Sequence, residues 1–386
     1  MNVFMKQNLE IRKVETCKQL GQFVQFYNDL YRNCPYAVPF LYSDELGTLK
    51  KDKNPAFDFC EAEYYLAIRE GRVVGRVAAI INHRANERWG RKQVRFGWLD
   101  FIDDLDVSAA LVNAVEQWGQ KKGMTEISGP LGFTDMDREG MLVEGFERLS
   151  TMYVNYNYSY YPQHIQRLGG FRKDNDYLEF RVKVPEIIPE KIARVAQMVQ
   201  KRFNLRVHKF SRRELLKEGM GLEVFRILNR TYDGLYGFSQ LSEKQIDKLV
   251  EDYIKKADLN LVTAIMDDNK DGQMVGFGIA FPSFSLALQK TRDGHLLPFG
   301  WWHLLKILKF HATNTVDLLL IGVLPEYRTK GADALFFDDL LHRFQDYGFE
   351  WAEAMPQMET NKAVLSHWQY FESEQHRRHR CFSRDI

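Results

Sequence analysis

The two halves of this 386-residue chain repeat one pattern of secondary structure. Residues 64–80 (YYLAIREGRVVGRVAAI) and 261–281 (LVTAIMDDNKDGQMVGFGIAF) each contain a β-rich run, a polar turn and a second β-rich run. Gly71 and Gly272 stand in the turns, where a tight hairpin needs a positive φ. The sequence therefore predicts two hairpins of the same kind.

The order of elements around the two hairpins also agrees. A short strand and a helical pattern precede each hairpin, and a strand, a helix and a further strand follow it. The two prolines of residues 182–191 (VKVPEIIPEK) suit a linker between the repeats. We predict a duplicated α+β fold with mixed sheets, with repeats at 1–185 and 195–386. Chance similarity of ordinary hairpins is the alternative.

Composition narrows the class of protein. The chain has 53 Lys and Arg against 52 Asp and Glu, a net charge of +1, which disfavours a general nucleic-acid binder. Its four cysteines lie far apart without a CxxC motif, so we expect a reducing, cytoplasmic setting and no disulfide framework. No apolar run has the length of a signal-peptide core or a membrane span, so we expect at most peripheral membrane contact.

A strand that runs into a helix through a cationic turn is the main functional signal. Residues 317–323 (DLLLIGV) form a short apolar run typical of a buried strand, and 332–348 have helical spacing. Arg328, Thr329, Lys330 and Gly331 fall between them. The unpaired N–H groups and the dipole at a helix N-terminus favour a pyrophosphate there. An ordinary strand–helix turn with solvated cations remains open.

This stretch resembles a known family. The residues that carry the resemblance are Val323, Pro325, Glu326, Tyr327 and Arg328, then Gly331, and Asn361 in METNKAV. They are similar to the Arg/Gln-x-x-Gly-x-Gly/Ala region and the following Asn of the GNAT superfamily of acyl-CoA N-acyltransferases. Asp333 stands where the family has Gly or Ala, and Ala334 follows one residue late.

The resemblance implies that the C-terminal repeat binds acetyl-CoA or a longer acyl-CoA as co-substrate. In the family the fourth strand separates from the fifth at a bulge, and pantetheine pairs with the free edge. The N-terminal repeat has no such glycine pattern between Arg95 and Val112, so it would instead shape the acceptor side. The residues expected beside the pantetheine are Leu320, Ile321, Gly322, Val323 and Leu324; those expected at the phosphates are Arg328, Thr329, Lys330, Gly331, Ala332, Asp333 and Ala334, with Asn361 beyond them.

Aminolysis of a thioester needs a base for the amine and a proton for the leaving thiolate. Glu353 and Glu326 are candidate bases, although each could equally be a solvated carboxylate. Many family members use a Tyr seven residues after the Asn as the acid; here that position is Trp368. Tyr370 is the nearest substitute, but two residues along a helix turn it far round the axis.

A metal site is the weaker interpretation of the C-terminal segment. His376, His379 and Cys381 have a spacing that can hold zinc, but the arginines between them favour a solvated basic tail. We therefore predict no metal.

Two segments bear on the acceptor. Residues 295–311 (HLLPFGWWHLLKILKFH) are rich in Leu and Trp, and would form a buried helix, an interfacial helix or the wall of an acyl-chain pocket. Residues 131–147 form a long Gly-rich and acidic stretch typical of a functional loop. We expect a small-molecule or lipid-like amine, as in the bacterial sphingoid-base acylating enzymes that the chain resembles.

The predicted function is transfer of an acyl group from acyl-CoA to an amine. Two alternatives stay open: an acyl-CoA-binding sensor or scaffold that has lost catalysis, and a transferase that uses aminoacyl-tRNA. The near-zero net charge counts against the second.

Overall fold

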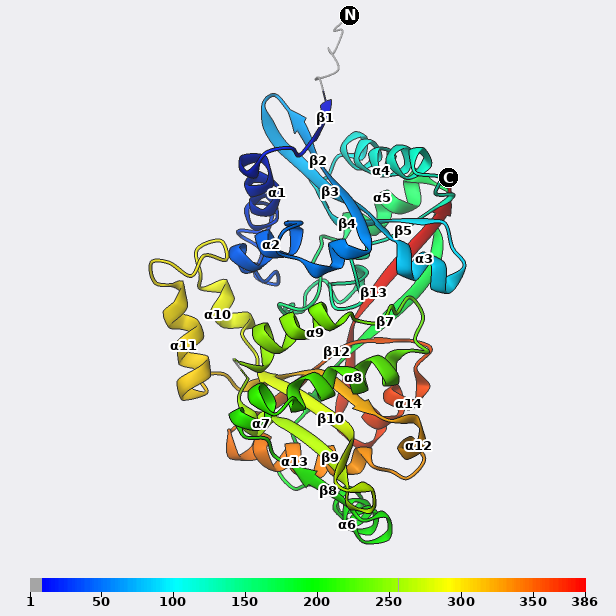
Figure 1. Ribbon diagram of the computed structural model, residues 1–386. Coiled ribbons are helices and arrows are strands. Elements are labelled where there is room, and N and C mark those ends of the chain that lie inside the picture. Colours follow the sequence, from blue (N-terminus) through cyan, green and yellow to red (C-terminus); the bar gives the residue numbers. More distant parts are fainter. Residues whose placement is uncertain (1–8, 256) are drawn as a thin grey trace, which may run out of the picture. The chain divides into compact units, whose positions relative to one another are not determined.

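The computed structural model describes residues 9–255 and 257–386, which form two compact units (Figure 1). The N-terminal unit holds the chain up to Leu178 together with Phe284–Leu304 and His376–Ile386. The C-terminal unit holds Glu179–Ser283 and Leu305–Gln375. The units divide the chain differently from the predicted repeats 1–185 and 195–386. Phe284–Leu304 and His376–Ile386, which fall in the predicted C-terminal repeat, belong to the N-terminal unit, and the C-terminal unit begins at Glu179. The repeat boundaries themselves stay a prediction.

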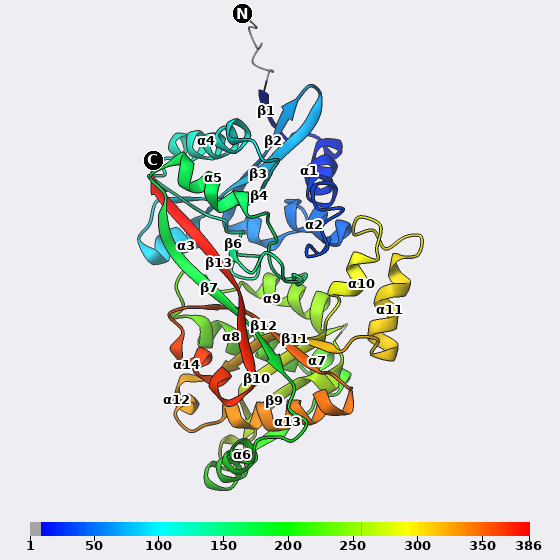
Figure 2. The ribbon, with the colours of Figure 1, turned by 180° about the vertical axis from the view of Figure 1, so that it is seen from behind.

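The N-terminal unit is built on one mixed sheet. Its strands run in the order β1-β2-β3-β4-β5-β13, and all neighbours are antiparallel except β4 and β5. The short strand β6 also pairs with β13, which is red in Figures 1 and 2. The bounds are β1 (Leu9–Lys13), β2 (Cys60–Arg69), β3 (Arg72–Asn82), β4 (Gln93–Phe101), β5 (Glu126–Gly129), β6 (Met141–Glu144) and β13 (Ser373–Asp385).

Helices cover both faces of this sheet because its strands are apolar on both sides. Ala78 and Ile80 of β3 pack with α1, whereas the alternate residues Val77 and Ala79 pack with α4. A capping box of Thr16 and Gln19 begins α1. The helices of this unit are α1 (Cys17–Leu30), α2 (Tyr42–Leu49), α3 (His83–Trp89), α4 (Leu105–Lys121), α5 (Tyr160–Leu168) and α10 (Ser285–Gln289).

The C-terminal unit repeats the arrangement. Its strands run β8-β9-β10-β11-β12, again antiparallel except for the last pair, and β7 (Arg172–Lys183) lies beside β12. The predicted duplication of an α+β fold is confirmed by this shared order. The bounds are β8 (Leu205–His208), β9 (Val262–Asp267), β10 (Gln273–Pro282), β11 (Thr315–Val323), β12 (Trp351–Met358), α6 (Glu190–Phe203), α7 (Arg212–Lys217), α8 (Met220–Tyr232), α9 (Glu243–Leu249), α12 (Pro325–Arg328), α13 (Asp333–Asp346) and α14 (Lys362–Leu365).

The prediction of a solvated basic tail is wrong. Residues 376–381 lie in β13, where His376, Arg377 and His379 are buried. Arg380 Nε lies 2.7 Å and Arg378 Nη1 3.0 Å from the carboxylate of Asp176, which is fully buried. The arginines are there to neutralise this buried acid. Among the described residues, no group of three His, Cys, Asp or Glu side chains is arranged to hold a metal ion.

Residues 131–147 carry a half-buried acid, Asp137, as well as the short strand β6. Asp137 accepts a hydrogen bond from the Thr134 N–H at 3.0 Å. Burial raises the pKa of Asp137 to about 6, although backbone amides and Arg138 oppose the shift. Between about pH 4 and pH 6, Asp137 is therefore protonated in the folded chain but ionised in the unfolded chain.

The stability of the N-terminal unit should consequently depend on pH. The contribution of protonated Asp137 is complete below the ordinary aspartate pKa and is lost as pH rises through about 6. From about pH 4 to about pH 6.5 the free energy of unfolding should fall by about 1–3 kcal/mol through this residue. Urea denaturation of the wild type and of Asp137→Asn at several pH values measures it. An equal pH slope in the two proteins would contradict the assignment.

Candidate functional site

Strands β11 and β12 pair at one end and separate at the other. Their parallel pairing runs from Thr315 opposite Trp351 to Leu318 opposite Ala354, and within the described residues it stops there. Both strands continue beyond this point. On its other side β11 stays paired with β10, with one extra residue, Leu319, at a register shift. The bulge turns β11 away from β12, and among the residues that the structure describes no strand pairs with the rest of this edge of β11.

The backbone groups at this edge can be assigned from the pairing with β10. The Leu324 N–H bonds the Val275 carbonyl at 2.9 Å, so Gly322 also faces β10, while Ile321 and Val323 face the open edge. Two carbonyls at the edge are already bound. The Tyr232 hydroxyl donates to the Ile321 carbonyl at 3.3 Å, and Arg328 Nε donates to the Val323 carbonyl at 3.1 Å. The N–H groups of Ile321 and Val323 point the same way, towards the place of an extended ligand.

The turn after β11 leads to a helix N-terminus. A single helical turn, α12, follows the strand, and Gly331 adopts a φ of 75° before α13 begins. A Cβ on Gly331 would lie 3.5 Å from Val195 of α6, so the residue is glycine for its backbone angle rather than for lack of space. The N-terminus of α13 has no side-chain cap from Ala332. Backbone and dipole here are suited to an anion.

The cations of this turn are held by the protein itself. Arg328 Nη2 donates to the Thr231 carbonyl at 2.7 Å, in addition to its bond to Val323, and so ties the end of α8 to the end of β11. The Lys330 amine lies 4.1 Å from the centre of the Tyr327 ring. Arg328 thus shapes the open edge, whereas the expectation that it contacts phosphate stays a prediction.

Asp333 gives the helix N-terminus a negative group of its own. His367 Nε2 lies 2.6 Å from its carboxylate. Burial would raise the pKa of Asp333, but the bond to His367 and the amides of Asp333 and Ala334 outweigh burial and hold the pKa below its ordinary value. The sequence pattern assigns the amides at this helix N-terminus to a phosphate. In the structure the Asp333 carboxylate already bonds two of them, so a bound phosphate would share these amides with Asp333.

Of the predicted catalytic residues, Glu353 lies nearest to the point where the strands separate. It is buried on β12 opposite Asp317, one residue before the pairing stops, and Arg181 Nε lies 3.5 Å from its carboxylate. Glu326 is exposed on α12, 3.7 Å from Arg230. Position thus favours Glu353 over Glu326 as a base.

The predicted residues after β12 have local contacts. Asn361 accepts a bond from the Val364 N–H at 3.5 Å and begins α14. Trp368 is buried and donates to Gln357 at 2.8 Å. Tyr370 is 43% exposed, and the Lys191 amine lies 4.4 Å from its ring centre. Its assignment as an acid stays a prediction without a supporting contact.

Sequence reasoning missed Tyr232. This residue ends α8, and its hydroxyl reaches the β11 edge from a helix that comes 89 residues earlier in the chain. Burial raises the pKa of Tyr232 to about 12, so its phenol is protonated at neutral pH. The helix itself is predictable from its spacing, but no local pattern indicates which strand its end contacts.

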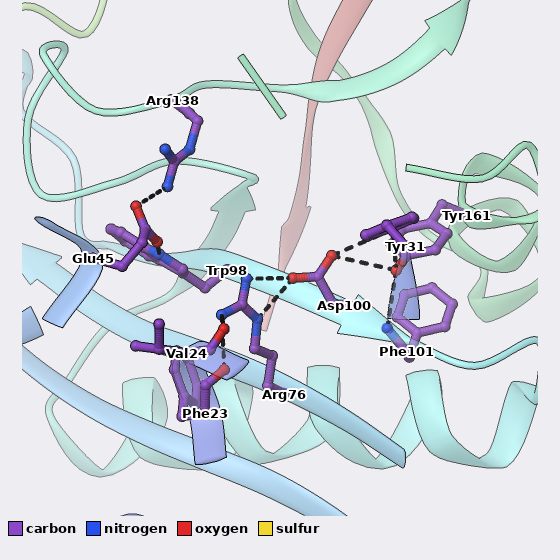
Figure 3. Close-up of polar contacts among 10 residues, drawn as sticks. All are labelled: Phe23, Val24, Tyr31, Glu45, Arg76, Trp98, Asp100, Phe101, Arg138 and Tyr161. Carbon is purple, nitrogen blue, oxygen red and sulfur yellow. Dashed lines mark hydrogen bonds and ion pairs between the residues drawn. The ribbon is translucent and has the colours of Figure 1, made fainter. Parts of the chain in front are cut away.

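The N-terminal unit has the same separation of strands, but its edge is closed by side chains. Figure 3 shows one of them, Tyr161, beside Phe101. Strand β4 pairs with β5 only over Gln93–Arg95, and a bulge at Trp98, which has a φ of 46°, opens the rest. The Phe101 N–H donates to the Tyr161 hydroxyl at 3.0 Å, and the Tyr160 hydroxyl donates to the Phe101 carbonyl at 2.6 Å. The Tyr161 side chain thus binds at Phe101 the N–H group whose counterpart at Val323 is directed to the open edge of β11.

A buried ion pair fills the remaining space. The Arg76 guanidinium, 1% exposed, lies 2.7 Å from the Asp100 carboxylate and donates to the Phe23 carbonyl at 2.8 Å. Tyr31 and Tyr161 share a 2.8 Å bond beside it (Figure 3). The cavity left among these residues has a volume of about 20 Å³, room for one water molecule at most.

The helix that follows β4 is also unsuited to phosphate. Asp104 caps α4 by accepting bonds from the N–H groups of Asp106 and Val107 at 2.9 and 3.3 Å. Its carboxylate occupies the place of an anion. The structure therefore supports a ligand edge in the C-terminal unit and a closed counterpart in the N-terminal unit.

The N-terminal unit has an open cavity elsewhere. Its volume is about 630 Å³, and it lies between α1 and the segment that follows α10. Its walls mix aromatic and polar side chains. Among the residues that line it are Tyr27, Tyr31, Arg32, Gln289 and Asp293.

Comparison with known proteins agrees with this architecture. Protein YghO of Escherichia coli (strain K12) is 26% identical over 375 residues, covering 95% of this chain and 93% of that protein. The bacterial ceramide synthase of Caulobacter vibrioides is 25% identical over 335 residues, covering 84% and 82%. A tandem GNAT protein from the clavulanic acid biosynthesis pathway superposes with a TM-score of 0.56 at 12% identity, covering 98% of both chains. No family model matches the sequence.

Proposed function

We propose that this chain, which has the duplicated fold of the tandem GNAT proteins, transfers an acyl group from an acyl-CoA thioester to an amine. The observation that carries the proposal is the open edge of β11, with the N–H groups of Ile321 and Val323 directed to it. An extended, amide-containing arm such as pantetheine can pair with such an edge as a strand does. The glycine turn and the N-terminus of α13 follow at the end where the phosphates would lie.

The reaction needs two proton transfers besides the bond exchange. The amine nitrogen attacks the thioester carbonyl, the carbon–sulfur bond breaks, and the leaving thiolate takes a proton. Tyr232 is our candidate donor, because its hydroxyl reaches the edge where the thioester would lie. Glu353, beside the point of separation, is the candidate acceptor for the proton of the amine, directly or through water. Backbone N–H groups of β11 would stabilise the oxyanion.

We further propose a lipid-like amine as the acceptor. One relative that matches 84% of this chain is named a ceramide synthase, and ceramide is made by acylating a long-chain amine. The 630 Å³ cavity of the N-terminal unit is large enough for part of such a molecule. The proposal places the acceptor side on the N-terminal unit.

Titration calorimetry with acetyl-CoA and palmitoyl-CoA, followed by an assay for released coenzyme A with sphinganine present, tests the proposal. We expect binding of at least one thioester and release of coenzyme A that depends on the amine. Binding without release would favour the acyl-CoA sensor, for which buried Trp368 in place of the usual acid is an argument. If neither thioester binds, the enzyme and the sensor are both excluded.

Replacing Tyr232 by Phe tests the proton donor. We expect kcat to fall by about 10²-fold with KM for the thioester little changed, because a general acid contributes about that factor to the chemical step. Tyr370→Phe tests the other candidate acid in parallel and should leave kcat unchanged if Tyr232 is the donor, since Tyr370 is 43% exposed. Equal kcat values for Tyr232→Phe and wild type would remove Tyr232 from the mechanism.

A further inference from the structure

Exposed apolar side chains gather on one hairpin of helices. Among the residues that the structure describes, thirteen large apolar side chains are exposed, and seven of these lie between residues 286 and 310. They belong to α10, to α11 (Gly300–Phe310) and to the segment between these helices, which are yellow in Figures 1 and 2. The prediction that 295–311 form a helix holds for α11, but the interpretation as a buried helix does not. We call these seven residues the α10–α11 apolar face: Leu286, Leu297, Phe299, Trp301, Trp302, Leu308 and Phe310.

The base of this hairpin is held firmly by the N-terminal unit. The Asp293 carboxylate lies 3.0 Å from Arg32 Nη2, and the Asn28 amide donates to the Asp293 carbonyl at 2.8 Å. The Tyr42 and His295 rings stack with centres 4.4 Å apart. The apolar side chains are therefore presented by an anchored element, with Leu297 77% and Phe299 76% exposed. A face of this kind marks an interaction surface.

Charge and spacing indicate the partner. On α11, Trp301, Leu305 and Leu308 recur at helical spacing and form one stripe, while Trp302, Lys306 and Lys309 form the adjacent stripe. The hairpin between residues 285 and 311 also carries Lys290 and Arg292, and its one acid, Asp293, is paired with Arg32. Apolar side chains, flanked by lysines and by Trp, which favours a lipid–water boundary, match an anionic lipid surface.

We propose that the α10–α11 apolar face docks this protein on the surface of an anionic lipid bilayer. Docking would be interfacial, since no helix in the described ranges has the length and apolar character to cross a membrane. The 630 Å³ cavity adjoins the same hairpin, because Gln289, Thr291, Arg292 and Asp293 line it. A lipid leaving the bilayer would thus meet the cavity at the base of the docking element. The binding itself does not depend on the proposed acyl transfer.

Vesicle flotation of the full chain tests this proposal. We expect the wild type to float with vesicles that contain phosphatidylglycerol and to remain largely unbound with pure phosphatidylcholine. Trp301→Ser/Trp302→Ser should lose binding at least tenfold. Lys306→Glu/Lys309→Glu should lose it on the order of 30-fold or more, the factor expected for two surface lysines. Ile187→Ser, which removes an 86% exposed apolar side chain from the segment between β7 and α6, is the control and should bind as the wild type does.

Three results would overturn the proposal. The first is a wild type that does not float with anionic vesicles, and the second is a tryptophan variant that floats as well as the wild type. The third is a concentration-dependent dimer, seen by sedimentation without vesicle binding, that the same tryptophan substitutions abolish; the face would then bind a second copy of the chain. Circular dichroism of each variant checks that the fold is intact, and none of these measurements requires catalytic activity.

Discussion

Arg76→Met should destabilise the N-terminal unit by about 3–5 kcal/mol, the usual cost of removing one partner of a buried ion pair. Arg76 is 1% exposed, and its guanidinium is the cation bonded to Asp100. Burial raises the pKa of Asp100, and Arg76 opposes that rise. Without Arg76 the carboxylate must either stay charged in an apolar setting or take up a proton. Scanning calorimetry should show the transition of this unit at a clearly lower temperature.

Two further variants test whether the loss of stability comes from the unpaired charge of Asp100 or from the removal of any ion pair. Arg76→Met/Asp100→Leu should recover most of the lost stability, because both charges are then replaced by apolar groups of similar size. Arg12→Met breaks the exposed pair with Glu10 and should leave the transition temperature unchanged. If the double variant is no more stable than Arg76→Met, the unpaired Asp100 is not the cause of the loss, and the ion pair itself stabilises the closed edge of β4.

Most of the fold could be predicted from the sequence, because its signals are local. The hairpin turns at Gly71 and Gly272, the alternating apolar residues of β3 and the helical spacing of α13 all depend on neighbours in the chain. The paired elements of the two halves followed from the same signals. The C-terminal strand was not predicted, because its arginines and histidines resemble a solvated tail. Their partner Asp176 lies about 200 residues earlier, and no local pattern indicates the contact.

The candidate site was less predictable, because its geometry depends on contacts between distant segments. The motif indicated the turn at Gly331 and the strand that precedes it. It could not show that Arg328 bonds backbone carbonyls rather than standing free, or that Tyr232 reaches the edge from α8. Glu326 and Glu353 look alike in the sequence, yet one is exposed and the other is buried beside the separating strands.

Val323→Pro should weaken binding of palmitoyl-CoA by about 10- to 100-fold, the factor for a lost backbone donor whose partner stays unpaired. Proline removes the Val323 N–H, which the pairing with β10 directs to the open edge. The ladder to β10 is spared, because Gly322 and Leu324 supply its bonds. Proline is tolerated on an edge whose N–H groups do not pair within the sheet. The dissociation constant from calorimetry is the measurement.

Val323→Ala is the matched control, since it shortens the side chain but keeps the backbone donor. It should bind palmitoyl-CoA within about threefold of the wild type, a difference of about 0.6 kcal/mol. Alanine removes the two γ-methyl groups but keeps the N–H group, so any further loss of affinity in the proline variant reports on the missing donor and the ring. Equal affinities of the two variants would mean that a thioester, if bound, does not pair with β11. The open edge would then be a feature of the fold that this chain retains without using it.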